Sequence, residues 1–535
     1  MDTVIYNPLE DYEKRFKEAH LAATADFFDS LVKQSGVNAD ENRSTVALYN
    51  EFTENIKKLK TKRNWLRFFR VVMIITLVLI PVVIWKMTPK IRTLKENIET
   101  ATDKAEELLG KAREQMAPLN ALFDERDCLK LIEKTVPLLN FEQHFTADHE
   151  LDMTTNFDFM QDTSDDQSTL DVLAGRYNEN PFLFENKLVM TMGMETYHGY
   201  KTIYWTETYR DSDGRTQTRT RSQTLHATVT KPKPFYDTQV VLNYGSQGGP
   251  ELSFSRDASN LHKKSEGQIE RHIKRGEKKL KKMTDRAIKE NDDFMSMSNT
   301  DFEVLFDALD RTNEVQFRTL FTPLAQTNMV DLILSKTGYG DDFNFFKRNR
   351  MNKIVSNHSQ GRPIKLSPSE YEHYSFDVIR ERFIGKNTEF FKAVYFDFAP
   401  LFAIPMYRER PVHSLKPIPD TARMYSQKEC ESLANLIDKD IVVHPNTKTP
   451  AIIKSQYVRT DGKADETSVT AYSFDIFKRI EIVPMFGEDG RMHNVEVPWD
   501  EYDSLEYYNS FRVASWGASA GKDVLAIHNG LCIFS

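Results

Sequence analysis

The sequence predicts an α+β protein in which helical segments and a large antiparallel β region lie on either side of one apolar run. Residues 71–85 read VVMIITLVLIPVVIW, with one threonine as the only polar side chain. Around this run apolar residues recur at helical spacing, whereas from about Phe141 the pattern changes to alternation with turn signals. Because the regular strand–helix alternation of a parallel sheet is absent, we expect antiparallel sheet beside segregated helices.

The composition is that of a folded globular chain. Its 535 residues are 40% apolar and 28% charged, with 71 basic against 79 acidic side chains, and the length suits roughly two to four folded units. A net charge of -8 argues against a nucleic-acid-binding protein, and a mean hydropathy of -0.53 excludes a polytopic transporter. The three cysteines, Cys128, Cys430 and Cys532, are too scattered for a disulfide scaffold or a zinc module.

Residues 1–64 are predicted to form a helical hairpin. Apolar residues recur at helical spacing from Leu9 to Leu31, and a second helical pattern runs from about Ser44 into the apolar run. The connection between them, residues 35–42, is rich in turn formers.

Residues 65–87 are predicted to form one transmembrane helix. Trp65 and Trp85 are twenty residues apart, and at ~1.5 Å per helical residue they span the hydrocarbon thickness of a bilayer, with each indole at an interface. A buried core helix or a signal peptide fits less well, because basic residues flank the run and 64 mostly polar residues precede it. The predicted anchor residues are Trp65, Phe68, Phe69, Val71, Pro81 and Trp85.

The charges beside the run predict its orientation. Residues 51–70 carry seven Lys and Arg, and residues 86–105 carry five. The more basic flank is expected in the cytoplasm, which predicts a single-pass protein of the cell membrane with a cytoplasmic N-terminus.

Residues 88–140 are predicted to form a helical stalk. Thr88 is followed by Pro89, a helix cap with proline at the first helical position. A heptad pattern then predicts a coiled-coil seam that joins two copies of the chain, so a fragment of residues 87–140 should self-associate. The alternative is an ordinary amphipathic helix packed on the globular domain. The seam residues are Ile91, Leu94, Ile98, Ala101, Ala105, Leu108 and Ala112.

From about residue 141 the chain is predicted to form a mixed domain with a β-rich part at 141–260, a helical part at 261–345 and an α+β part at 346–535. Its clearest hairpin is 199–232, whose turn at 211–214 ends in glycine. Both faces are polar near this turn, so that end should project into water. Further predicted elements are strands at 391–406, 469–484 and 492–497 and a short helix at 427–439.

Two glycine-containing segments invite comparison with phosphate-binding loops. In WGASAGKDVL, residues 516–525, only three residues separate Gly517 from Gly521, and Asp523 stands where a serine or threonine is needed. GSQGG, residues 245–249, has no neighbouring lysine. We therefore interpret the first as a plain turn and the second as a connection between strands.

Polar clusters give no convincing metal site or catalytic pair. His144 and His149 are five residues apart, which puts their rings on different faces of a helix or strand. Nothing around His528 and Cys532 marks a catalytic cysteine, and a free cysteine is most often a small buried hydrophobe. The remaining polar residues considered as ligands are Glu142, Asp148, Glu150, Asp158, Asp162, Asp165 and Asp166. We assign no catalytic, cofactor-binding or metal-binding residue from the sequence.

The largest local charge asymmetry is at residues 263–289, with eleven Lys and Arg against four Asp and Glu. Its narrow apolar stripe predicts a helix. A solvated helix is favoured over one that contacts anionic lipid or an acidic partner, because acidic residues lie within and just after the run.

Two segments resemble parts of uncharacterised bacterial membrane-anchored proteins: WTETYRDSDGRTQTRTRSQTLHATVTKP and FEVLFDALDRTNEVQFRTLFTPLAQTNMVDLI. Together they cover 60 residues, about a ninth of the chain. The resemblance implies a bacterial, membrane-attached protein and transfers no functional residue.

These patterns predict a single-pass, membrane-anchored binding or assembly protein that uses no cofactor. The expected partners are the lipid bilayer and either another protein or a second copy of the chain bound through the stalk, but not nucleic acid. A membrane-tethered hydrolase acting at the cell envelope is the alternative function.

Overall fold

The computed structural model describes residues 5–75, 88–160, 164–210, 212–290, 294–411, 416, 423–515, 524–528 and 530–534. The chain divides into two compact units. Unit 1 comprises Met1–Pro137 with Lys365–Phe396, and unit 2 comprises Leu138–Ile364 with Asp397–Ser535. The α+β class with antiparallel sheets is confirmed, because every strand pair in the described residues is antiparallel.

Unit 1 is helical and has an aromatic core. His20 stacks on Phe391 with 4.0 Å between ring centroids, and Phe383 contacts both Phe28 and Phe123 with centroids 5.5 Å apart. The segment around residues 376–396 therefore completes a core that the N-terminal helices begin. The helices are α1 (Pro8–Asp11), α2 (Lys17–Ser35), α3 (Ala39–Ile75), α5 (Thr88–Asn120), α6 (Asp127–Thr135) and the first part of α12 (Phe376–Phe402).

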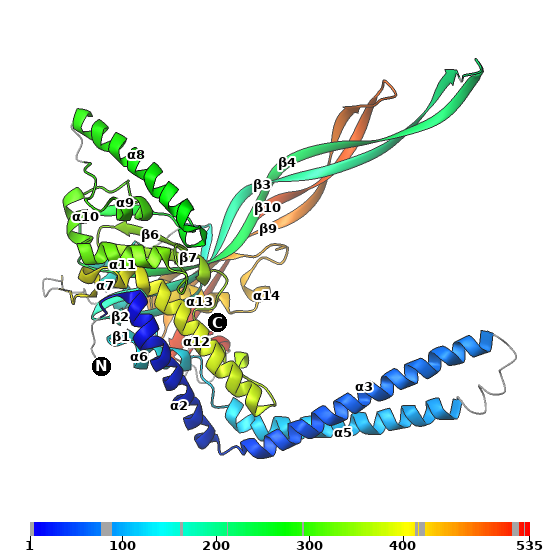
Figure 1. The fold of residues 1–535 in the computed structure, drawn as a ribbon, viewed down its shortest axis with the longest axis horizontal. Helices are drawn as coiled ribbons and strands as arrows, with labels where there is room; N and C mark the ends of the chain where they lie inside the picture. Colours follow the sequence, from blue (N-terminus) through cyan, green and yellow to red (C-terminus); the bar gives the residue numbers. More distant parts are fainter. Residues whose placement is uncertain are drawn as a thin grey trace. The chain divides into compact units, whose positions relative to one another are not determined.

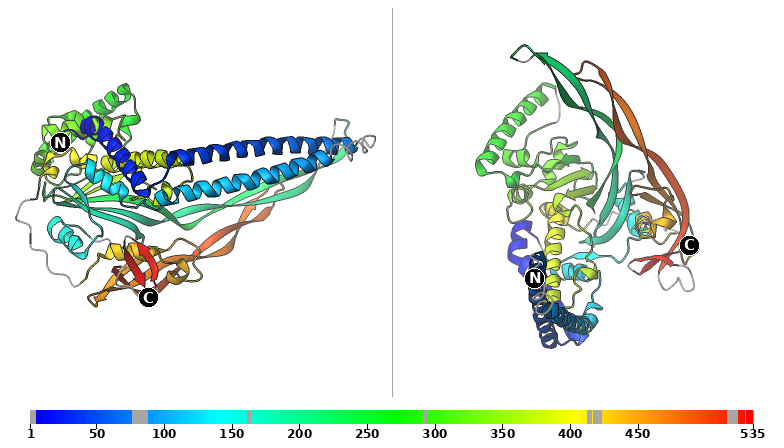
Figure 2. Two further views of the ribbon diagram at one scale, coloured as in Figure 1. Left: turned by 90° about the horizontal axis from the view of Figure 1, so that it is seen from below. Right: turned by 90° about the vertical axis from the view of Figure 1, so that its right-hand side faces the viewer.

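The long helices α3 and α5 run side by side in opposite directions (Figure 1; Figure 2). Ile56 of α3 is buried with Ile98, Ala101 and Ala105 of α5. The predicted hairpin at 1–64 is therefore wrong in its pairing, since α3 pairs with α5 instead of α2. The physical reason is that the apolar face of α3 fits the apolar seam of α5, while Gly36, with φ of 67°, ends α2 and redirects the chain.

No helix within the described residues is both long enough and apolar enough to cross a membrane. Most of the predicted transmembrane segment, residues 76–87, lies outside those residues. Pro81 and Trp85 fall in this part, and the side chain of Val71 is not described either.

Unit 2 is built on a seven-stranded sheet and a five-stranded sheet in the described residues, with strand orders β1-β2-β3-β4-β7-β6-β5 and β11-β12-β10-β9-β8. The strands of the first sheet are β1 (Leu139–Phe141), β2 (Gln167–Tyr177), β3 (Asn180–Arg210), β4 (Thr216–Gly245), β5 (Ser253–Arg256), β6 (Phe343–Arg348) and β7 (Met351–Ser356). Those of the second are β8 (Ile452–Thr460), β9 (Asp465–Phe486), β10 (Met492–Ser515), β11 (Val524–His528) and β12 (Leu531–Phe534).

Two long hairpins extend from these sheets, β3–β4 and β9–β10, and lie along each other (Figure 1; Figure 2). Ile203 and Leu225 of the first pack on Val495 and Val497 of the second. At Gly199 an added Cβ would lie 2.2 Å from the Glu496 carbonyl oxygen, so only glycine allows this close approach. The hairpin expected at 199–232 is confirmed, and the described residues of its tip are exposed.

The helices of unit 2 are α7 (Ala147–Phe157), α8 (Glu266–Glu290), α9 (Thr300–Phe306), α10 (Glu314–Leu320), α11 (Pro323–Leu334), α13 (Gln427–Asn435) and α14 (Lys439–Val442). The strand predicted at 391–406 is wrong, because residues up to Phe402 belong to α12. Apart from Lys392 and Asp397, this part of α12 is apolar, and it is almost entirely buried, so the helical period is lost and its aromatic content imitates a strand.

Candidate functional site

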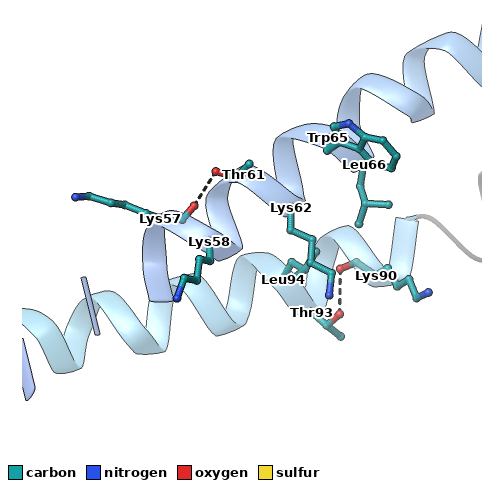
Figure 3. Close-up of a pocket in the computed structure, with 9 residues that line it drawn as sticks. All are labelled: Lys57, Lys58, Thr61, Lys62, Trp65, Leu66, Lys90, Thr93 and Leu94. Atoms are coloured by element: carbon teal, nitrogen blue, oxygen red, sulfur yellow. Dashed lines mark hydrogen bonds between the residues drawn. The ribbon is translucent and has the colours of Figure 1, made fainter. Parts of the chain in front are cut away.

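A lysine-rich cavity lies between α3 and α5, at the end of this helix pair that adjoins the apolar run. Its volume is about 870 Å³. We call it the lysine groove. Its lining residues are Lys57, Lys58, Thr61, Lys62, Trp65, Leu66, Lys90, Thr93 and Leu94 (Figure 3).

Helical spacing brings the groove residues together. On α3, Lys58, Lys62 and Leu66 are four residues apart and therefore lie on one face. The Lys62 side chain extends toward α5, where Leu94 is buried (Figure 3). The groove thus combines an apolar floor with ammonium groups contributed by both helices.

The groove lysines are poorly neutralised by the protein. Lys58 has one carboxylate nearby, with 3.7 Å between its Nζ and Glu54 Oε2. Among the described residues, no carboxylate lies within salt-bridge distance of Lys57, Lys62 or Lys90. The local field is therefore positive and attracts anions.

Exposed aromatic side chains lie beside the groove on α3. Trp65 and Phe68 are both 64% exposed, and Phe69 is 37% exposed. The Trp65 and Phe69 ring centroids are 4.2 Å apart. Aromatic rings next to Lys and Arg are typical of the boundary between lipid and water, where the ring enters the lipid and the charge meets the headgroups.

The residues of the predicted oligomer seam face α3 of the same chain. Ile91, Leu94, Ile98, Ala101, Ala105 and Ala112 are buried, and Leu108 is half-buried. Further along the pair, Asn42 Nδ2 donates to Gln115 Oε1 at 3.3 Å. In this conformation the seam is filled within one chain, and self-association through it stays a prediction.

The structure does not bring His144 and His149 to a common ligand position. His149 Nδ1 lies 2.8 Å from Glu142 Oε2, whereas His144 Nδ1 lies 3.8 Å from Glu429 Oε1. Although burial favours the neutral acid, the hydrogen bond from His149 and the Arg176 charge hold the pKa of Glu142 below its ordinary value. Both histidines therefore belong to polar contacts between elements of unit 2.

No group of three or more His, Cys, Asp or Glu side chains in the described part of the chain is arranged to hold a metal ion. Asp158 instead binds Arg350, with 3.0 Å between Oδ2 and the guanidinium. Asp162 lies outside the described residues.

The pair His528 and Cys532 is not assembled. On the paired strands β11 and β12, Cys532 is opposite Ile527, so the His528 side chain lies on the other face. Cys532 is fully buried and donates to the Ala514 carbonyl oxygen at 3.4 Å. Burial also raises the pKa of the Cys128 thiol to about 12 and that of Cys430 well above its ordinary value.

In the GSQGG loop, residues 245–249, a backbone carbonyl oxygen accepts a hydrogen bond from a buried lysine. Lys347 Nζ donates to the Gly248 carbonyl oxygen at 2.8 Å, and burial lowers the pKa of Lys347 to about 7. The Ser246 and Gly248 amides are already hydrogen-bonded, to Arg350 O and Ser246 Oγ. This loop is therefore not arranged to cradle a phosphate. Residues 516–523 of the other glycine segment lie outside the described residues.

The basic run at 263–289 forms α8, as predicted. Leu280 and Ala287 are buried, and Gly276 lies so close to Val304 that an added Cβ would be 2.3 Å from it. Most of the basic side chains on the helix are exposed. Their contact with lipid or with an acidic partner stays a prediction.

Sequence reasoning missed the lysine groove and a buried charge cluster in unit 2. Burial alone would raise the pKa of Glu185. The charges of Lys428 and Lys187 outweigh burial and lower this pKa to about 2. Lys187 Nζ is 3.1 Å from Glu185 Oε2, and Asn243 donates to the same oxygen at 2.9 Å. A glutamate within an otherwise apolar strand is a sequence signal that could have predicted this cluster. The lysine groove could not be predicted in this way, because it forms only when α3 pairs with α5.

No known protein family, curated protein or solved structure matches this chain. The resemblance of two segments to uncharacterised bacterial proteins therefore stays a prediction, and function must be inferred from the residues themselves.

Proposed function

We propose that this chain is a membrane-attached protein that binds a partner or assembles at the membrane surface, with its attachment in residues 65–87. The observation that carries the proposal is the lysine groove, which lies where α3 leads into the apolar run. Lysines supply attraction to anionic headgroups, exposed aromatic rings enter the interface, and the apolar run supplies insertion.

Electrostatics support a lipid surface as the first partner. Among the described residues no carboxylate lies within salt-bridge distance of Lys57, Lys62 or Lys90, so binding phosphate breaks no ion pair at these three lysines. Each lysine near an anionic membrane contributes ~1 kcal/mol. Stable membrane binding needs two attachment signals. The lysines supply the electrostatic signal and the apolar run supplies the hydrophobic one.

An exposed apolar stripe on the β9–β10 hairpin supports a role in partner binding. Ile480, Ile482 and Phe486 of β9 are 65%, 57% and 67% exposed, and Met492 of β10 is 60% exposed. The three β9 residues share a face, because they lie an even number of positions apart. The opposite face of this hairpin packs on β3–β4. Exposed apolar patches of this kind mark protein or membrane contacts.

The test is flotation of the full chain with preformed vesicles, diluted from detergent. Vesicles of phosphatidylcholine alone are compared with vesicles that also contain phosphatidylglycerol. We expect stronger binding to the anionic vesicles and at least a tenfold loss when Lys57, Lys58, Lys62 and Lys90 are all replaced by Gln, since each contributes ~1 kcal/mol.

The matched control carries the same loss of charge on α8, with Lys274, Lys278, Lys281 and Lys282 replaced by Gln; these side chains are exposed. It should bind anionic vesicles like the unmodified chain. A full-length protein that floats with neither kind of vesicle contradicts the proposed function, and loss of binding only in the α8 variant moves the lipid contact to α8.

A further inference from the structure

The pairing of α3 with α5 bears on how residues 65–87 meet the membrane. The two helices are antiparallel partners along their length. Asn42 bonds Gln115 at one end, Ile56 is buried with Ala101 in the middle, and Leu66 and Leu94 line one cavity at the other end. The helices that precede and follow the apolar run are thus paired, and their ends beside the run line one cavity.

A single transmembrane crossing requires the opposite arrangement. The hydrocarbon core of a bilayer is ~30 Å thick, so the two flanks of a crossing segment are separated by that distance and by a membrane. Lys62 and Lys90, one from each flank, line the same cavity. One cavity lies on one side of a membrane, and both flanks therefore lie there too.

From this geometry we propose that the α3–α5 pair enters the membrane from one face, with both flanks of the apolar run on the same side and lysines of both helices bound to phosphate groups of one leaflet. The inference rests on the proposed membrane attachment and replaces a single-pass crossing with entry from one side.

Burial within the helix pair supports this arrangement. A two-sided crossing would pull α5 away from α3 and expose the apolar residues now covered, of which Ile56 and Ile98 are 8% and 6% exposed. It would also separate Lys111 from Glu41, whose charged atoms are 3.6 Å apart. Entry from one side keeps all these contacts.

The test is sidedness of two single cysteine variants of the full chain in sealed vesicles from the expressing cells. Asn55→Cys on α3 and Asn97→Cys on α5 place a thiol at an exposed asparagine on each flank. The native cysteines are all buried, so the unmodified chain serves as the background control. A membrane-impermeant maleimide is added before or after detergent.

We expect the two variants to behave alike, with both labelled before detergent or both labelled only afterwards. Labelling of one before detergent and of the other only afterwards overturns the inference and leaves membrane attachment standing. Absence of the chain from the vesicle fraction overturns the proposed function, and with it the inference. A doubly substituted chain, Asn42→Cys with Gln115→Cys, adds a second measurement, since disulfide formation in the membrane fraction shows that the helices are paired there.

Discussion

A buried histidine makes unit 1 sensitive to acid. His20 is fully buried, its Nδ1 lies 3.0 Å from Thr135 Oγ1, and burial lowers its pKa from 6.5 to about 4. The unfolded chain therefore takes up a proton more readily than the folded one. The resulting stability is fully present above pH 6.5 and is lost as the pH falls through 4.

We predict that the free energy of unfolding of unit 1 falls by about 3 kcal/mol between pH 6.5 and pH 4, given ~1.4 kcal/mol per pKa unit. His20→Gln should be less stable at neutral pH but should depend less on pH in this window. Urea unfolding of the full chain in detergent, followed through hydrogen exchange of unit 1 amides, measures the stability at neutral pH and its dependence on pH. His272→Gln, at a half-buried position on α8, is the control. An unchanged slope in His20→Gln contradicts the prediction.

Glu185 provides the corresponding test in unit 2. Its carboxylate is buried between Lys428 and Lys187, so Glu185→Gln leaves two buried ammonium groups without their counter-ion. Breaking a buried pair in this way costs about 3–5 kcal/mol. The folded pKa of about 2 lies below the ordinary value of 4.5, so this stability is present above pH 4.5 and is lost as the pH falls through 2.

We expect Glu185→Gln to lower the urea midpoint of unit 2 strongly at neutral pH and to remove the acid dependence between pH 4.5 and 2. Glu195→Gln is the matched control, because Glu195 of the same strand pairs with Lys233 at the surface. Exposed pairs contribute about 0–1 kcal/mol. Equal effects of the two substitutions would show that burial of the Glu185 cluster has no energetic consequence.

At the scale of elements, the α3–α5 pair depends on its narrow apolar seam. Ile98 is 6% exposed and packs with Ile56, Ala101 and Ala105. Truncation of a buried isoleucine to alanine costs about 2–5 kcal/mol. We predict that Ile98→Ala speeds hydrogen exchange of α3 amides by at least about tenfold in the full chain. Thr100→Ala, at an exposed position of α5, should leave exchange unchanged. If the amides of α3 exchange hydrogen at the same rate in the two variants, pairing with α5 does not stabilise α3.

The elements differ in how far the sequence predicts them. The β3–β4 hairpin was predictable because its alternation and its glycine-ended turn are local signals. The seam of α5 was equally visible, but a seam shows only that a helix has a partner, and the partner proved to be α3. Because the lysine groove exists only once these two helices pair, it could not be found before them. The prediction for the end of α12 failed for a different reason, because nearly complete burial removes the alternation of polar and apolar residues that marks a helix.

At the scale of the whole molecule, the two units are assembled from separated stretches of the chain. Residues 365–396 join unit 1 after an intervening stretch of more than two hundred residues that belongs to unit 2. Their aromatic residues, such as Phe383 and Phe391, complete the core around Phe28 and His20. Local patterns carry no information about such joining, so the sequence did not reveal it. Loss of this segment should therefore damage unit 1.

Residues 65–87 are proposed to attach the chain to lipid. The most direct test is to lyse expressing cells without detergent, centrifuge at high speed, and wash the membranes at high salt and then at alkaline pH. We expect the full-length protein to stay in the membrane pellet, while Leu79→Asp, which puts a charge into the apolar run, shifts it to the supernatant. Unmodified protein in the supernatant after the first centrifugation would show that residues 65–87 do not attach the chain to lipid.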